Sequence, residues 1–322
     1  MYFTSHGEDP AGVERPLLTF VGASTLDALA LVERYPGQDE RVVASDLAFA
    51  GGGPAATAAV AAARLGHRAA FIGAVGSDET GDEIIAGLTR EGVNTDAMLR
   101  LDGVESGASV VVIARTSASR AISNRPLPRT DLTAHAAARE LLAESAWVHT
   151  DHIGWEPTMR TLEELTTRPR TSFDGGHLME GFTARGLDLY VPTLETLGRR
   201  FGRLPAEELL RLAAEECGGA VVVTDGAAGA WLFSRSKEAR RIPGFEIDVI
   251  STLGAGDVFH GALLAQVVEG WPLPEAVRRA NAVAALSTTS LDGRSGIPSR
   301  DALDEFLSTS HSPVNHSTQE SR

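Results

Sequence analysis

A glycine-rich turn followed by a long apolar run is the feature that most constrains what this chain can fold into. The turn is Ser251–Asp257 (STLGAGD), and the run behind it is Val258–Ala265 (VFHGALLA). Apolar residues in the run recur at helical spacing, and residues 245–250 before the turn alternate apolar and polar residues as a strand does. We therefore expect a strand, a glycine turn and a helix in direct succession.

This arrangement suits an anionic ligand. Gly254 and Gly256 allow positive φ angles and a close approach of the backbone, and the free N–H groups that open a helix bind anions. Asp257 stands at the same helix start, where a carboxylate can take the proton from a hydroxyl that attacks a phosphoryl group. The plainer interpretation is a helix cap, a common use of Asp in this position. The motif alone leaves both open.

Composition narrows the function classes. The 322 residues are 43% apolar and 22% charged, as in an ordinary globular protein, and they suffice for one or two α/β domains. The net charge of −14 argues against binding to nucleic acids or acidic membranes. Lys237 is the only lysine, which excludes a Walker-type phosphate loop. Cys217 is the only cysteine, which excludes an internal disulfide and a cysteine metal cluster.

The ends and the segmentation of the chain point to one domain. Residues 1–15 and 309–322 are polar, and we expect flexible tails there. No apolar run reaches the roughly 20 residues of a membrane helix, and the first residues lack the pattern of a signal peptide. Neither a repeat nor a linker divides residues 16–308. The expectation is a cytoplasmic enzyme with one domain.

Three further turns follow predicted strands or precede predicted helices. The apolar strand 16–21 leads to Asp27, and an acid beyond a strand's carboxyl end is where open α/β sheets bind ligands, although it can also cap a turn. Gly51–Gly53 precedes a small-residue helix at 55–66, which brings amides near a substrate or simply allows close packing. The buried strand 220–224 runs into a glycine turn at 225–229 that can approach a phosphate.

Other predicted elements carry fewer signals. A strand at 109–114 is followed by a polar loop at 115–129 that contains Asn124, and a helix at 274–287 carries Asn281. The strand 147–152 contains His149 and His152. Two histidines three residues apart suggest a metal only when a third ligand accompanies them, and none does here. We assign no metal-binding residues.

Taken together, three stretches resemble one family, the ribokinase-like (PfkB) sugar kinases. They are GGGPAATAAVAAARLG at 51–66, TDGAAG at 224–229 and TLGAGDVFHG at 252–261, in an order and spacing that fit residues 16–308. The resemblance implies an α/β fold: a three-layer α/β/α sandwich with a mainly parallel central sheet and a small β-sheet lid at about 28–50 and 98–125. It also implies ATP, Mg²⁺, a sugar substrate and a homodimer formed through the lid.

The resemblance assigns roles to individual residues. Asp257 matches the catalytic base, and Gly254, Ala255 and Gly256 match its anion hole. Substrate-binding positions fall on Asp27, Gly52, Gly53, Asn124 and Asp151, and nucleotide-binding positions fall on Thr224, Gly226, Gly229 and Asn281.

The wording of the motifs, including GRSGIP at 293–298, is most similar to 6-deoxy-6-sulfofructose kinases, which use an asparagine such as Asn124 near the anionic group. Two arginines of that subgroup are replaced here, one by Ser45 and one within 152–154, which leaves Arg120, Arg125 or His152 to supply the charge. Ser251 replaces an acid tied to a monovalent-cation site. Positions tied to magnesium handling are occupied by Thr193 and Thr196, with Glu195 one place off.

The expected function is transfer of the γ-phosphoryl group of ATP to a hydroxyl of a small carbohydrate, a ketose or a sulfofructose-like sugar. A nucleoside or ribose kinase of the same fold is one alternative. Another is a sugar-binding protein without turnover, which the substitutions at 193, 196 and 251 suggest. A dinucleotide-dependent oxidoreductase is a third, but the turn at 22–27 lacks its Gly-x-Gly-x-x-Gly fingerprint.

Overall fold

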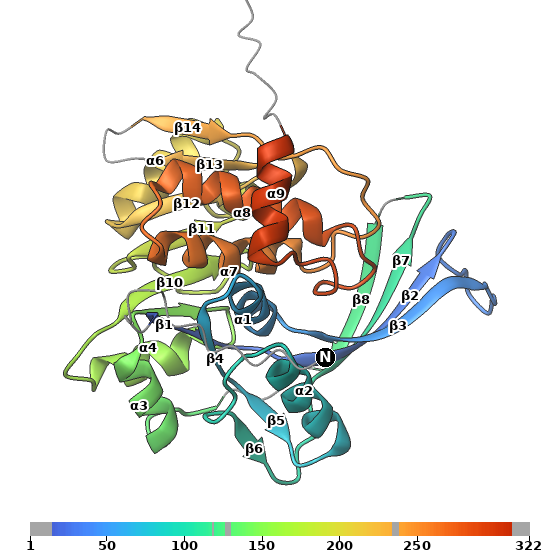
Figure 1. Ribbon diagram of the computed structural model, residues 1–322, viewed down its shortest axis with the longest axis horizontal. Coiled ribbons are helices and arrows are strands. Elements are labelled where there is room, and N and C mark those ends of the chain that lie inside the picture. Colours follow the sequence, from blue (N-terminus) through green and yellow to red (C-terminus); the bar gives the residue numbers. More distant parts are fainter. Residues whose placement is uncertain (1–14, 118, 126–129, 234–237, 311–322) are drawn as a thin grey trace, which may run out of the picture.

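The computed structural model of the chain describes residues 15–117, 119–125, 130–233 and 238–310. The expected tails fall almost entirely outside the described residues, apart from Arg15 at one end and 309–310 at the other. Figure 1 shows a layered body with a ribbon of strands that extends from one side. Within the described part of the chain, no helix is long and apolar enough to cross a membrane.

An eight-stranded sheet forms the centre of the body. Its strand order is β14-β13-β12-β11-β10-β9-β1-β4. In this order β12, β11, β10, β9, β1 and β4 run parallel, β13 is antiparallel to β12, and β14 is antiparallel to β13. Parallel strands buried on both faces are almost continuously apolar, as the sequences of β1 and β12 are. The strands are β1 (Leu17–Val21), β4 (Arg68–Ile72), β9 (Trp147–Thr150), β10 (Arg170–Gly175), β11 (Leu189–Pro192), β12 (Ala220–Thr224), β13 (Ala230–Phe233) and β14 (Ala239–Ile242).

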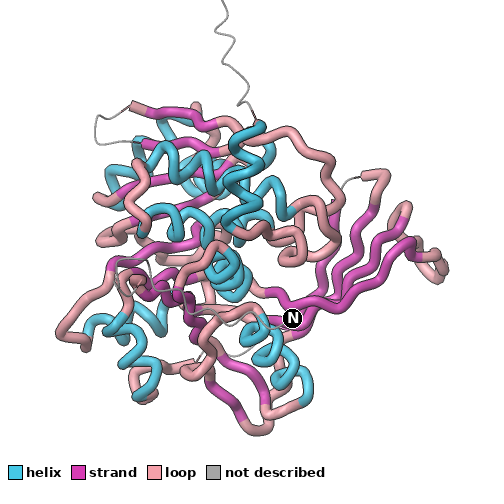
Figure 2. Tube along the Cα trace, in the orientation of Figure 1, coloured by secondary structure: helices cyan, strands magenta, loops and turns pink. Residues whose placement is uncertain are grey.

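Helices cover both faces of this sheet, so the predicted three-layer sandwich is confirmed (Figures 1 and 2). One layer contains α1 (Pro54–Arg64), α2 (Glu79–Arg90), α7 (Ala255–Val268), α8 (Leu273–Ser287) and α9 (Arg300–Thr309). The other contains α3 (Ala136–Glu144), α4 (Trp155–Glu163), α5 (Leu194–Phe201) and α6 (Ala206–Cys217). A side chain at Gly261 of α7 would overlap the carbonyl of Ala58, so the small residues of α1 serve close helix packing.

The ribbon in Figure 1 is a separate four-stranded sheet, the lid. Its order is β3 (Ala44–Gly52), β2 (Thr25–Val32), β7 (Ala108–Ala114) and β8 (Ser119–Arg125). One lid face packs Leu29, Leu31, Val111 and Ile113 against Leu291 of the body. The expected lid segment 98–125 was too long, because β6 (Leu99–Leu101) pairs instead with β5 (Ala74–Gly76) in a two-stranded sheet.

The strand expected at 245–250 was wrong. This segment contains no strand, although it alternates in polarity. The central sheet ends at β14, so the segment has no strand to pair with. Instead the backbone N–H groups of Ile250 and Ser251 both donate to the carbonyl of Thr288, and Phe245 packs against Phe306 of α9. The glycine turn is therefore held by the end of α8 and the turn after it.

Candidate active site

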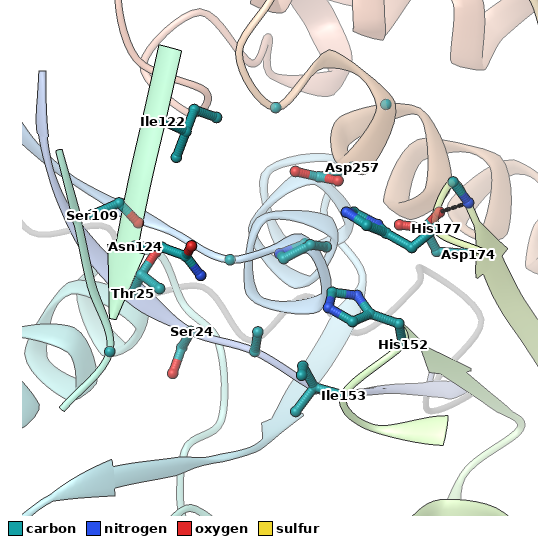
Figure 3. Close-up of a pocket in the computed structure, with 18 of the residues that line it drawn as sticks. Ser24, Thr25, Ser109, Ile122, Asn124, His152, Ile153, Asp174, His177 and Asp257 are labelled. Carbon is teal, nitrogen blue, oxygen red and sulfur yellow. Dashed lines mark hydrogen bonds between the residues drawn. The ribbon is translucent and has the colours of Figure 1, made fainter. Parts of the chain in front are cut away.

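The lid and the carboxyl ends of the central strands enclose a cavity of about 590 Å³. Figure 3 shows Asn124 and Ser109 from the lid on one side of it, and Asp257, Asp174 and His152 from the body on the other. Seven of the thirteen predicted site residues line this cavity: Asp27, Gly53, Asn124, Thr224, Gly254, Gly256 and Asp257. The other six do not line it: Gly52, Ala255, Asp151, Gly226, Gly229 and Asn281.

The predicted anion hole is the start of α7. Gly254 is its N-cap with φ 72°, a left-handed conformation that favours glycine. Gly293 from the turn after α8 packs so closely that a side chain on Gly254 would lie 3.0 Å from its Cα. Gly256 does not have the positive φ expected of it, because it lies inside the first turn of the helix. Gly254, Gly256 and Asp257 of this turn line the cavity. The first N–H groups of a helix have no partner within the helix, and that of Ala255 donates to the carbonyl of Thr252 at 3.4 Å.

Asp257 is partly exposed to the cavity. Burial in the cleft raises the pKa of its carboxyl group to about 7, and the nearby carboxylate of Asp174 adds to this increase, whereas His260 and Arg120 oppose it. An ordinary aspartate has a pKa near ~3.9 and is a weak base. The environment therefore gives Asp257 a proton affinity suited to proton transfer near neutral pH.

The other end of the cavity holds Asp27. Its Oδ1 accepts a 2.7 Å hydrogen bond from the hydroxyl of Thr25, and its second oxygen lies where a side chain on Gly52 would have to be. Gly53 has φ 91°, and a side chain there would overlap the carbonyl of Ala23. The Gly51–Gly53 turn thus leaves room for the Asp27 carboxylate and brings backbone beside it.

The side chain of Arg294 holds the Gly51–Gly53 turn in place, a role that we did not predict from the sequence. The side chain is buried and donates to Thr57 Oγ1 at 3.2 Å and to the carbonyl of Gly52 at 2.8 Å. Burial lowers the pKa of Arg294 to about 10, and the Asp27 carboxylate is the first of the groups that oppose this. Arg294 follows Gly293 directly, so one short turn supports both the anion hole and the Asp27 end.

Asp151 is a correction to the predicted substrate-binding set. Its side chain is fully buried. One carboxylate oxygen accepts from the N–H groups of Ile153 and Gly154, and the other accepts from those of Ala23 and Ala55. Because both oxygens are bonded to backbone amides, Asp151 joins three chain segments at the base of the cavity and does not face a substrate.

The predicted nucleotide-binding residues lie near one another, at and beyond the edge of the cavity. Thr224 lines the cavity at the end of β12. Gly226 and Gly229 have φ 54° and 97°, and a side chain on Gly229 would overlap the carbonyl of Ile242. The side-chain amide of Asn281 donates to the carbonyls of Ile242 and Pro243. Asn281 therefore holds the chain that packs on the 226–229 turn, and the nucleotide contacts themselves stay predictions.

Two lid arginines and three histidines of the body, His152, His177 and His260, also line the cavity. Arg125 forms a 3.0 Å ion pair with Glu105. Arg120 reaches from β8 to the body and donates to Thr252 Oγ1 at 2.9 Å, two residues before the anion hole. His152 and His177 stack with their ring centroids 4.4 Å apart. Of the two lid arginines, Arg120 therefore places its charge near the anion hole.

Two residues that line the cavity, Asp174 and His260, were not predicted from the sequence. The available signals were the glycine that follows Asp174 at the end of a predicted strand, and the three-residue spacing of His260 from Asp257 on one helix. His149 lies within the sheet, where its Nδ1 bonds Ser172 Oγ at 2.7 Å.

Magnesium-binding positions are not evident in the described residues. They contain no group of three or more His, Cys, Asp or Glu side chains able to hold a metal ion. The hydroxyls of Thr193 and Thr196 bond each other at 2.8 Å, and Glu195 pairs with Arg199 on the surface. Mg²⁺ often binds through substrate phosphates and water rather than through a protein cage, so the ion can enter as part of the MgATP substrate.

Comparison with known proteins is consistent with this site. The model of the pfkB family carbohydrate kinases matches residues 15–174 and 176–300. A ribokinase of Bacillus subtilis is 29% identical over 296 residues, which cover 89% of this chain and 98% of the relative. An aminoimidazole riboside kinase of Salmonella typhimurium is 28% identical over 288 residues, covering 81% and 88%. The structure of Arabidopsis thaliana ribokinase with ribose and ATP has a TM-score of 0.75 and 23% identity, covering 92% and 100%.

The fold and the family match define the class: this is a phosphotransferase with an alcohol group as acceptor. The chain belongs to the pfkB family of carbohydrate kinases. Its relatives indicate that the chain is a ribokinase-family sugar or nucleoside kinase.

Proposed function

We propose that this chain transfers the γ-phosphoryl group of MgATP to a hydroxyl of a small, uncharged ketose or pentose. One observation carries the proposal: Asp257 and the amides that open α7 share a single cavity with Asp27 and Gly53. A sugar held by Asp27 through one hydroxyl can thus present another hydroxyl to Asp257 while the phosphates of ATP occupy the anion hole.

The residues divide the work by chemistry. Asp257 accepts the hydroxyl proton, and the amides at 254–257 stabilise negative charge on the transferring phosphoryl group. Asp27, with the backbone of the 51–53 turn, orients the sugar, and such positioning can contribute about 7–11 kcal/mol to the rate. The lid over the cavity excludes water, which would otherwise compete with the sugar for the phosphoryl group.

The lining of the cavity favours a neutral sugar over the other substrates of the fold. A nucleobase binds best by stacking on aromatic rings, and the described residues that line the cavity include no Phe, Tyr or Trp. A sulfonate or sugar phosphate needs a cation near the sugar end, but Arg125 is already paired with Glu105 and Arg120 lies beside Thr252. Sulfofructose remains a candidate because Asn124 lines the cavity from the lid.

Sugar-dependent release of ADP tests the proposal. We expect turnover with a neutral ketose or pentose at higher kcat/KM than with sulfofructose, 6-phosphoketoses or nucleosides. Asp257→Asn should lower kcat by roughly 10²–10⁴-fold and leave ATP binding intact, since a general base contributes about that much. Sugar binding by calorimetry without any ADP release would instead indicate a binding protein, and near-normal turnover of the variant would remove Asp257 as the base.

A further inference from the structure

Four buried polar side chains lie at the junction of β9, β10 and α7, beneath the end of the cavity that contains Asp257. They are His149 of β9, Ser172 and Asp174 of β10, and His260 of α7, and none is more than 7% exposed. Burying polar or charged side chains costs free energy unless they bond one another. Neither phosphate binding nor sugar orientation requires this cluster.

The contacts within the cluster come in two pairs. His260 Nε2 lies 3.2 Å from Asp174 Oδ1, and the same oxygen accepts a 2.8 Å hydrogen bond from the N–H of Gly176. His149 Nδ1 bonds Ser172 Oγ at 2.7 Å. The rings of His149 and His260 lie 5.0 Å apart, which brings the two pairs together.

The charges of the cluster follow from these contacts. Burial alone would raise the pKa of Asp174, but His260 and the Gly176 N–H outweigh it and hold that pKa well below its usual range. Burial alone would lower the pKa of His260, but Asp174 outweighs it and raises that pKa. Burial, together with the charge of His260, lowers the pKa of His149 to about 3. These contacts favour an ionised Asp174 and a neutral His149, and Asp174 favours the protonated form of His260.

Asp257 lies one helical turn before His260, and both residues line the cavity with Asp174. After burial, Asp174 is the main group that raises the pKa of Asp257, and His260 acts in the opposite direction. The remaining charges around Asp257 come from other elements: Asp151 follows β9, Arg120 is on β8, and Arg294 follows α8. Asp27, His152 and His177 line the same cavity.

We propose that Asp174 and His260 are positioning residues that set the pH at which Asp257 begins to act as the base. This inference rests on the proposed function. The negative charge of Asp174 disfavours ionisation of Asp257, so Asp257 stays protonated until the pH approaches neutrality. His260 acts in the opposite direction and limits that effect. Neither residue needs to touch the substrate to do so.

The pair predicts opposite effects of two near-isosteric substitutions. In Asp174→Asn the negative neighbour is absent, so Asp257 should release its proton at a lower pH, by up to about one pH unit. His260 also loses the carboxylate that favours its charge, and this loss offsets part of the decrease. In His260→Gln the carboxylate of Asp174 stands uncompensated, so Asp257 should release its proton about one pH unit higher. The double variant should resemble Asp174→Asn, because His260 carries little charge once Asp174 is gone.

The measurement is a carboxyl ¹³C NMR titration of Asp257 in the full chain, with the resonance assigned by its loss in Asp257→Asn. The pH profile of kcat is recorded in parallel, and its acid limb should move with the titration. His149→Asn is the matched control: it changes a buried but neutral histidine and should leave both unchanged. If Asp174→Asn fails to fold, the double variant replaces it, because the same shift to lower pH is expected of both.

The outcomes separate the two proposals. Absence of sugar-dependent ADP release in the wild type would refute the proposed function, while the titration of Asp257 would still decide the role of the pair. Shifts of Asp257 in the same direction in both single variants would overturn the inference. So would losses of kcat that are equal at every pH, since a merely structural role predicts that result.

Discussion

Asp257, the proposed base, is a residue whose environment suits the proposed reaction but lowers the stability of the fold. The cleft that raises its pKa to about 7 does so because it disfavours the charged carboxylate. In the unfolded chain the same group would titrate near ~3.9. At a pH between the unfolded and the folded pKa, Asp257 is protonated in the folded protein and ionised in the unfolded chain. Above the folded pKa, the folded protein contains an ionised carboxylate in a cleft that disfavours it.

We therefore predict that Asp257→Asn stabilises the protein at pH 8 and not at pH 3.5. For a carboxyl group with a raised folded pKa, the cost is absent below the unfolded pKa, grows as the pH rises and is complete above the folded pKa. A displacement of about three units is worth about 4 kcal/mol. Because Asp257 is partly exposed, we expect a gain on the order of 1–2 kcal/mol. Urea unfolding at both pH values measures it, and an equal gain at both would show that the carboxylate charge is not the cause.

The sequence predicted Asp257 itself, because a glycine turn and an apolar helical run surround it within fifteen residues. It could not predict Asp174 or His260 as partners of that base, since the pairing depends on how β10 approaches α7 in space. Asp151 entered the substrate-binding set through the family resemblance, and a sequence motif does not show which groups bond to a carboxylate. The four amides that bond its oxygens belong to Ile153, Gly154 and segments as distant as Ala23 and Ala55.

At the level of elements, β8 connects the lid to the end of the cavity where we propose that phosphate binds. Arg120 on this strand donates to Thr252 Oγ1, close to where the helix start of α7 would hold a phosphoryl group. Arg125 lies on the same strand but forms an ion pair with Glu105. A guanidinium bonded to a neutral hydroxyl can move to a phosphoryl oxygen more easily than one bonded to a carboxylate.

We predict that Arg120→Ala lowers kcat by about 10²-fold while the KM for the sugar changes little, because a cation beside the transferring group acts mainly in the transition state. Steady-state kinetics with ATP and sugar varied separately measure this. Arg125→Ala is the matched control, since it removes the same charge from the same strand. Comparable losses of kcat in both variants would show that the overall positive charge of the lid, and not the position of Arg120, determines the effect on kcat.

Helices and strands with a clear periodic pattern were predictable from the sequence. Strands whose existence depends on which strand lies beside them were not. The glycine-flanked strand β12 and the helix α7 follow their patterns closely. The alternating segment 245–250 has a strand's pattern but no strand because the sheet ends at β14. Conversely, residues 99–101 form a strand outside the lid because β5, not β2 or β8, lies beside them.

At the level of the whole molecule, the lid presents an apolar face away from the cavity. Phe49 and Leu47 on β3 are 81% and 69% exposed, and Val110 on β7 is 55% exposed. Register places them on one face: Phe49 pairs with Ala28, and Ala28 pairs with Val110. The opposite face packs Leu29 and Val111 toward the body. Contiguous apolar surface of this kind commonly marks a protein–protein contact.

We predict that this face pairs two copies of the chain, and that Phe49→Ser weakens the dimer. In a two-fold symmetric interface each substitution occurs twice, so the dimer Kd should rise by at least about tenfold, as is typical for a buried aromatic anchor. Sedimentation equilibrium at micromolar concentration measures this.

Ile122→Ser is the control: Ile122 is 51% exposed on the same sheet but lines the cavity, so its loss should leave the dimer intact. A monomeric wild type would refute the prediction, and equal weakening by both variants would place the contact elsewhere on the lid. Because the paired lid also carries Asn124 and Arg120 into the cavity, we expect the Phe49→Ser monomer to retain Asp257 chemistry but to bind its sugar less tightly.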